Sequence, residues 1–398
     1  MRVIVGIFAL ALAILLAPQA TGAAWEPHHT NTHGTALTPD GRYYAAAVSG
    51  EPVRYVKVFD LEAREILRLD LGPGVGKVGD LAISADGTRL AFQLVPAAGR
   101  RAADVFSDQN ALMVVGVDGQ VEALLSAPGR YHGPPGLSWD GSALVFGVAD
   151  FSVGSRSIPK HPYAYDLETG AFTRLSDQGF ERIREIYFAE DGSGVWLRYW
   201  RPELPDGSVV GVLDYPPSLA DRPAPDRPSF FHTWWRFGDP LPTWSEPVTP
   251  WKDSTITNIG ADGRAYGQVM LGVSGFTRQM TAYGVVDQDL PPWSLWAASP
   301  GEPPAIIESD AMRAPPYPER VGISGSARYD SIRDRFVMIA VRETRRSRPR
   351  DRDYGPPFLA IRDASGFREV DTSDWPMRTV EVGFEWPDHL QPVRADAP

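Results

Sequence analysis

The histidines are the first candidates for chemistry, because neutral imidazole is the commonest transition-metal ligand among side chains. His28, His29 and His33 lie close together near the start of the chain. With His132 and an aspartate such as Asp150 they could hold a divalent metal, the only cofactor that the sequence suggests. The plainer interpretation is that His33 and His132 form hydrogen bonds at strand ends, and no cofactor is then expected.

Tryptophans are concentrated in one segment, since residues 196–251 hold six of the twelve. Trp234 and Trp235 stand beside His232 and Arg236. Trp combines a large apolar surface with a polar N–H, so it stacks well on flat ligands such as sugar faces. These four residues are therefore candidates for ligand binding. Alternatively, the rings pack their own segment onto the rest of the protein.

Arginines crowd into a second segment, where six occur within eleven residues and Arg345, Arg346 and Arg348 are central. Guanidinium groups suit carboxylate and phosphate, so an acidic glycan, a lipid head group or an acidic protein could bind there. The plainer alternative is a solvated loop balanced by Asp351 and Asp353. The chain as a whole carries a net charge of −11, which disfavours nucleic acid as a partner.

Signatures of known catalytic chemistry are missing from the sequence. The chain has no cysteine, which excludes thiol chemistry and disulfides, and it has no Gly-x-Ser-x-Gly motif. Residues 74–79 fit Gly-x-Gly-x-x-Gly but lead into a predicted strand instead of a helix, so they are no dinucleotide site. No catalytic residue is therefore assigned.

The first 24 residues have the pattern of a secretory signal peptide. Arg2 precedes the apolar stretch Val3–Leu16, and small residues follow up to Ala24. This stretch is shorter than the roughly 20 residues that cross a bilayer, and no other apolar run of its length occurs. We expect a mature protein that is periplasmic or secreted, with no transmembrane segment after cleavage.

A repeat determines which elements must position these residues. An Asp-Gly turn between two apolar segments occurs five times and returns in degenerate form a sixth time. Its aspartates are Asp40, Asp86, Asp140, Asp191, Asp262 and Asp330. Asp-Gly between β segments is a tight-turn signal, because Gly accepts positive φ and Asp bonds its own backbone. Similar spacing and matching flanks make the repeat a strong signal.

Each repeat predicts four short strands, which cannot bury both faces of their sheet alone and must stack as the blades of a β-propeller. We predict an all-β fold of six four-stranded antiparallel blades, starting near residues 34, 80, 136, 183, 255 and 320. Residues 379–386 could close the ring beside blade 1. A seventh blade within the 71 residues from Asp191 to Asp262 is the alternative.

The turn Ser84-Ala-Asp-Gly-Thr-Arg-Leu-Ala-Phe92 and the hairpin Tyr165-Asp-Leu-Glu-Thr-Gly-Ala-Phe-Thr-Arg-Leu-Ser176 resemble the WD40-like repeat of TolB-type β-propellers. The resemblance covers roughly residues 30–370 and is sharpest in blades 1–4. It implies a propeller in a periplasmic setting, without the α/β domain that precedes the propeller in TolB. It transfers no catalytic residue.

Strand alternation places the longest connections on one face of the disk, which also receives six of the seven histidines. Long loops on a rigid scaffold commonly carry function. We expect residues 25–398 to form the propeller, with a long insertion at 201–253 between blades 4 and 5. The predicted function is non-enzymatic binding of a protein or glycan on this face. A propeller hydrolase or lyase with a His/Asp metal centre at the channel mouth is the alternative.

Overall fold

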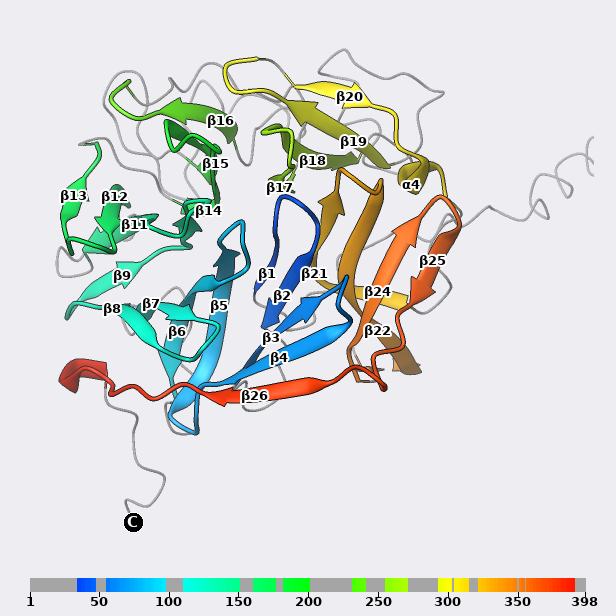
Figure 1. The fold of residues 1–398 in the computed structure, drawn as a ribbon, viewed down its shortest axis with the longest axis horizontal. Helices are drawn as coiled ribbons and strands as arrows, with labels where there is room; N and C mark the ends of the chain where they lie inside the picture. Colours follow the sequence, from blue (N-terminus) through cyan, green and yellow to red (C-terminus); the bar gives the residue numbers. More distant parts are fainter. Residues whose placement is uncertain are drawn as a thin grey trace, which may run out of the picture.

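A computed structural model describes residues 34–47, 55–97, 110–150, 160–176, 182–200, 231–240, 255–270, 293–302, 304–314, 321–348, 351–354 and 356–390. These residues form six sheets that are arranged around a central axis (Figure 1). The predicted all-β, six-bladed propeller is confirmed, and the described residues form no seventh blade.

The blades follow one another in chain order. Blade 1 contains β1 (Gly34–Leu37), β2 (Tyr43–Ala47), β3 (Tyr55–Asp60) and β4 (Glu65–Asp70). Blade 2 contains β5 (Val75–Ile83), β6 (Arg89–Pro96), β7 (Ala111–Gly116) and β8 (Val121–Leu125). Blade 3 contains β9 (Arg130–His132), β10 (Gly136–Leu137), β11 (Ala143–Asp150), β12 (His161–Asp166) and β13 (Phe172–Arg174).

The second half of the ring is less regular. Blade 4 contains β14 (Arg182–Phe188), β15 (Gly194–Trp200) and β16 (Phe231–Arg236). Blade 5 contains β17 (Thr255–Ile259), β18 (Ala265–Met270), β19 (Trp293–Ala298) and β20 (Ala305–Ile307). Blade 6 contains β21 (Val321–Asp330), β22 (Arg335–Arg348), β23 (Asp351–Tyr354), β24 (Phe358–Asp363) and β25 (Gly366–Glu369). The short helices α4 (Asp310–Arg313) and η4 (Asp388–Leu390) and strand β26 (Met377–Glu381) complete the described elements.

The hydrophobic core is divided among the six junctions between neighbouring blades. Side chains alternate along each strand, so successive residues point to opposite neighbours. On β2, Tyr44 and Ala46 pack against blade 6, whereas Ala45 and Ala47 pack against blade 2. Each of the six core clusters joins one pair of adjacent blades, as radial stacking requires.

The repeated turns connect the first two strands of their blades as predicted. In the first turn the Asp40 carboxylate accepts the Arg42 backbone N–H at 3.0 Å, and Gly41 has a φ of +72°. Asp86 and Asp140 accept equivalent bonds, and each also accepts one from a serine two residues earlier. The Asp-Gly repeat is therefore a structural motif, which explains why its aspartates need no catalytic role.

The C-terminal segment closes the ring from outside. Strand β26 pairs in parallel with β4, the outermost strand of blade 1 (Figure 1). Beyond it, Trp386 and Leu390 are buried in the core between blades 1 and 2. The segment predicted to close the ring, at 379–386, therefore continues from blade 6 along blade 1 and into the core between blades 1 and 2.

Strand β16 lies inside the range predicted as an insertion at 201–253. It pairs with β15 from Gly194↔Arg236 to Tyr199↔Phe231. The Phe237 N–H then donates to the Ser193 carbonyl, as Val117 does to Thr88 in blade 2. This recurring bond identifies β16 as the third strand of blade 4, so the range is divided into two connections, 201–230 and 241–254.

Candidate functional site

On the predicted binding face, the structure describes the strand ends but not the long loops that connect them. The second and third strands of a blade are antiparallel neighbours, so the end of one and the start of the next lie at the same edge of the sheet. The connections 48–54, 98–109, 151–159, 201–230 and 271–292 all join such ends and lie outside the described residues. We call this edge of the disk the loop face, and the opposite edge, with the Asp-Gly turns, the turn face.

An extended hairpin lies on the loop face where the sequence predicts a loop. Strand β22 is 14 residues long. Its first part pairs with β24, and its last part continues beyond the blade and pairs with β23. The register places Arg345 opposite Asp353, Arg346 opposite Arg352, and Arg348 opposite Asp351. The three predicted arginines are thus gathered on one two-stranded ribbon, the arginine hairpin, at residues 342–354.

The base of the arginine hairpin is anchored to the blade. Arg342 forms an ion pair with Glu369 of β25, and both side chains are exposed. Its guanidinium also lies 5.1 Å from the centre of the Phe358 ring. Surface ion pairs of this kind contribute little to stability, so we regard the pair mainly as an orienting contact.

Arg328 lies at the centre of the ring, where the sequence predicted no functional residue. It is only 9% exposed and lies on β21, the innermost strand of blade 6. Its guanidinium donates to the Thr35 hydroxyl at 3.0 Å and to the Thr35 carbonyl in blade 1. It also donates to the Tyr187 hydroxyl in blade 4 and the Thr257 carbonyl in blade 5. One side chain therefore joins four of the six blades.

The charge of Arg328 is retained despite its burial. Burial alone would lower its pKa, but nearby Tyr187 and Glu185 more than offset this, so the pKa is raised. Burial also raises the pKa of Tyr187 to about 12. The Glu185 carboxylate in turn accepts from Arg198 at 3.0 Å and from the Ile256 N–H at 3.0 Å. The axis is a polar network that holds the blades together.

His132, a predicted ligand residue, is 4% exposed. Its backbone is fixed by Asn110, which accepts from the His132 N–H at 3.0 Å and donates to its carbonyl at 2.6 Å. The ring lies 6.1 Å from the Phe146 ring, and Nδ1 has no hydrogen-bond partner among the described residues. Burial, with charge repulsion from Arg130 and His389, lowers the pKa of His132 to about 4.

The side chains of the other predicted ligand histidines are not among the described ones. His28, His29 and His33 lie outside the described residues, and His232 is known only by its backbone position on β16, opposite Arg198. Within the described part of the chain, no three His, Asp or Glu residues are grouped closely enough to hold a metal ion. The predicted metal site remains untested at its N-terminal histidines.

The two predicted contact tryptophans point to opposite neighbours. Trp235 is 2% exposed, packs in the core between blades 3 and 4, and donates from Nε1 to the Asp239 carbonyl at 2.9 Å. Trp234 is half-buried, 5.8 Å from the Trp196 ring, at the junction with blade 5. Arg236 is exposed at the end of the strand. The described residues thus cover Trp235, while Trp234 and Arg236 are partly accessible.

No family model matches the chain, and no curated protein matches its sequence. Among solved structures it is similar to TolB from Acinetobacter baumannii, at 13% identity and a TM-score of 0.40, over 84% of this chain and 61% of that one. An oligogalacturonate lyase from Vibrio parahaemolyticus has 14% identity and a TM-score of 0.42, over 86% of this chain and 78% of that one. A prolyl endopeptidase has 12% identity and a TM-score of 0.41, over 86% and 42%.

TolB is thus among the similar structures, as the repeat resemblance predicts, and the propeller itself is established by the six blades. The chain spans less than two thirds of the TolB chain and under half of the endopeptidase chain. No helix among the described residues has the length and apolarity to cross a bilayer.

Proposed function

We propose that this protein is a non-enzymatic binding protein whose loop face takes up an acidic protein or glycan. The arginine hairpin is the observation that carries the proposal. It brings Arg345, Arg346 and Arg348 together on a ribbon that extends beyond blade 6. Planar guanidinium groups bind carboxylate, sulfate or phosphate in a bidentate manner.

The arginine hairpin stands out because the chain as a whole is acidic. The chain carries a net charge of −11, which repels an anionic partner at long range. Attraction must then come from a local positive surface, whose influence extends about 8–10 Å at physiological salt. Six arginines within eleven residues supply such a surface. Glu343, Asp351 and Asp353 are the acidic residues of the same segment, and they leave the arginines in excess by three charges.

The hydrogen bonds across the axis favour binding at the surface of the loop face over passage through the ring. Arg328 joins blades 1, 4, 5 and 6 by hydrogen bonds across the centre. A partner would therefore contact the rim of the loop face, where the hairpin lies. We further propose that residues 1–24 are a signal peptide and that the protein acts in the periplasm or outside the cell, because Arg2 and the apolar Val3–Leu16 have that pattern.

Binding of three defined polyanions to purified protein tests the proposal: poly-L-glutamate for an acidic protein, and heparin and polygalacturonate for acidic glycans. We expect one of them to bind in low salt and to lose affinity steeply by roughly 0.5 M salt, where the screening length is only about 4 Å. The variant Arg345→Ser/Arg346→Ser should lose at least tenfold in affinity.

The matched control is Arg264→Ser/Arg313→Ser, which removes the same charge at positions outside the hairpin. Equal losses in both variants would mean that net charge alone drives binding. Affinity that is indifferent to both salt and the hairpin variant, or no binding of any polyanion, would overturn the proposal.

A further inference from the structure

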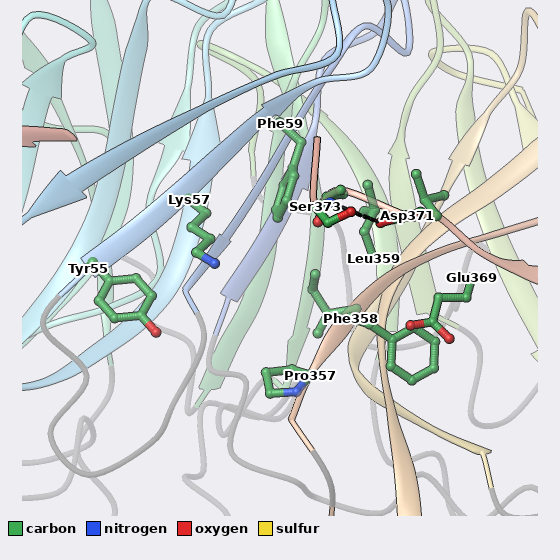
Figure 2. A pocket seen from close by; sticks show the side chains of 12 residues that line it. Tyr55, Lys57, Phe59, Pro357, Phe358, Leu359, Glu369, Asp371 and Ser373 are labelled. Carbon is green, nitrogen blue, oxygen red and sulfur yellow. Dashed lines mark hydrogen bonds between the residues drawn. The ribbon is translucent and has the colours of Figure 1, made fainter. Parts of the chain in front are cut away.

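A pocket of about 300 Å³ lies between blade 1 and blade 6 (Figure 2). One wall is strand β3, and the other is formed by β24 and the residues that follow β25. The pocket is separate from the polar network on the axis, but it adjoins the base of the arginine hairpin, where Arg342 pairs with the lining residue Glu369. Its volume is at the lower end of the range for small-molecule sites, which suits a ligand of about one or two sugar rings.

The inner part of the pocket is apolar and belongs to the hydrophobic core. Phe59, Ile339 and Leu359 are each at most 4% exposed and belong to the core between the two blades. Half-buried rings of Tyr55 and Phe358 line its sides. Aromatic rings and apolar side chains of this kind accept the flat face of a ligand without an ordering penalty of their own.

Lys57 is the cationic group of the pocket. Its side chain extends into the space between Tyr55 and Phe358 in Figure 2. Within the described part of the chain, no carboxylate forms an ion pair with it, whereas the neighbouring Arg68 is paired with Asp70 at 3.1 Å. Burial lowers the pKa of the Lys57 amine, and the charge of Arg68 lowers it further. An anion placed beside this amine would offset both effects.

The opposite wall carries oxygen acceptors. The Asp371 carboxylate accepts from the Ser373 hydroxyl at 2.7 Å and from its backbone N–H at 2.9 Å. These bonds lower the pKa of Asp371, so it stays ionised at neutral pH. Glu369 is held by its ion pair with Arg342. Both carboxylates keep lone pairs that can accept hydrogen bonds from ligand hydroxyls.

We propose that this pocket binds a small hydroxylated carboxylate, such as a sugar acid, with the carboxylate on Lys57 and the hydroxyl groups on Asp371 and Glu369. A neutral sugar would leave the amine without a counter-ion. A dianion would be repelled by the two acidic residues across the pocket. A monoanion with hydroxyl donors satisfies both walls at once. Lys57 and Asp371 lie outside the arginine hairpin, so the pocket would bind a smaller ligand than the hairpin does.

The chain has four lysines, Lys57, Lys77, Lys160 and Lys252, so each can be followed individually after reductive methylation with ¹³C-formaldehyde. The signal of Lys57 is assigned by its loss in Lys57→Met. Titration with glucuronate or galacturonate should shift the Lys57 signal saturably and leave that of Lys77 unchanged. Galactose, which lacks the carboxylate, and cyclohexanecarboxylate, which lacks the hydroxyls, should bind at least tenfold more weakly.

Calorimetric titration of the same sugar acids should show a loss of at least tenfold in Lys57→Met, equal to about 1.4 kcal/mol. The control Lys77→Met and the hairpin variant Arg345→Ser/Arg346→Ser should keep wild-type affinity. The inference is wrong if neither sugar acid shifts Lys57 in the wild-type protein, if galactose shifts it equally, or if Lys57→Met binds unchanged. Loss of binding in the hairpin variant would also overturn it, by assigning the acids to the hairpin instead.

Discussion

Arg328 of blade 6 donates a hydrogen bond to the hydroxyl of Tyr187 of blade 4, so two blades that are not neighbours are joined directly across the axis. The same guanidinium donates to the Thr35 and Thr257 carbonyls of blades 1 and 5. Cores between adjacent blades cannot make such a connection. The axial network therefore couples blades that the hydrophobic clusters leave independent.

Removal of this guanidinium should destabilise the whole ring. Arg328→Met removes the donors that Arg328 supplies to the Thr35 and Thr257 carbonyls and the bond to Tyr187, and we expect a loss of about 3 kcal/mol in the free energy of unfolding. Tyr187→Phe removes the bond accepted from Arg328 and the bond donated to the Thr257 carbonyl at 3.2 Å, and it should lose about 1–2 kcal/mol. Urea unfolding monitored by tryptophan fluorescence measures both. Equal stability of Arg328→Met and wild type would show that the network contributes nothing net.

The junction between blades 6 and 1 can be isolated with two glycines. Gly41 and Gly192 occupy equivalent turns, with φ of +72° and +66°. A Cβ on Gly41 would lie 2.3 Å from Cγ of Asp330, a fully buried carboxylate held by Arg335, whereas a Cβ on Gly192 would meet nothing within 4 Å.

Both glycine-to-alanine variants share the same backbone strain of about 1 kcal/mol, and only Gly41→Ala adds a steric conflict. We expect Gly41→Ala to be less stable than Gly192→Ala by at least about 1–2 kcal/mol. Thermal unfolding of the two proteins side by side gives the difference. Identical melting temperatures would mean that Asp330 moves away from the added methyl group at little cost in stability.

His132 should make stability depend on pH. Its pKa in the folded protein is lowered from 6.5 to about 4, because it is buried and lies near Arg130 and His389. Between these values the unfolded chain binds a proton that the folded protein does not, so the free energy of unfolding falls as pH falls from 6.5 to 4. The loss attributable to this group is about 2–3 kcal/mol.

In the variant His132→Gln this part of the pH dependence should disappear. Comparing wild type and variant at pH 7 and pH 4.5 by urea unfolding removes the contributions that carboxylates make to both proteins. Parallel pH profiles in the two proteins would show that His132 is solvated and titrates normally.

Trp235 is expected to behave as a core residue. It is 2% exposed between blades 3 and 4, so Trp235→Ala should cost about 3–5 kcal/mol. The exposed neighbour Arg236 provides the control, and Arg236→Ala should unfold within about 0.5 kcal/mol of wild type. If Trp235→Ala keeps normal stability but loses polyanion binding, then Trp235 contacts the ligand and is not a core residue.

The fold was predictable because its signal is local and repeated. The bonds from Asp40, Asp86 and Asp140 to their own turns are determined by the Asp-Gly sequence, and alternating strands follow each turn. The third strand of blade 4 was missed, because a long connection separates β16 from β15 in the sequence. The position of Trp235 was missed for the same reason, since only the register of β16 turns it towards blade 3.

The axial residues and the pocket depend on contacts between distant blades, which no local pattern encodes. Arg328 and Thr35 are 293 residues apart. The sequence did offer one signal. When the first strands of the blades are aligned by their pairing with the second strands, Arg328 takes the position of Ala36 in blade 1 and Ala82 in blade 2. A large cation in an innermost strand of small residues indicates a role at the axis. Lys57 offered no comparable signal, because its surroundings come from blade 6.

Hydrogen exchange of the protein with and without the polyanion that binds it best is the most direct test of a loop-face binding protein. We expect slower exchange at the arginine hairpin, residues 342–354, and at strand ends that border the loop face, with no change at the Asp-Gly turns of residues 84–88 and 138–142. Protection confined to those turns, or spread equally over both faces, would contradict binding at the loop face.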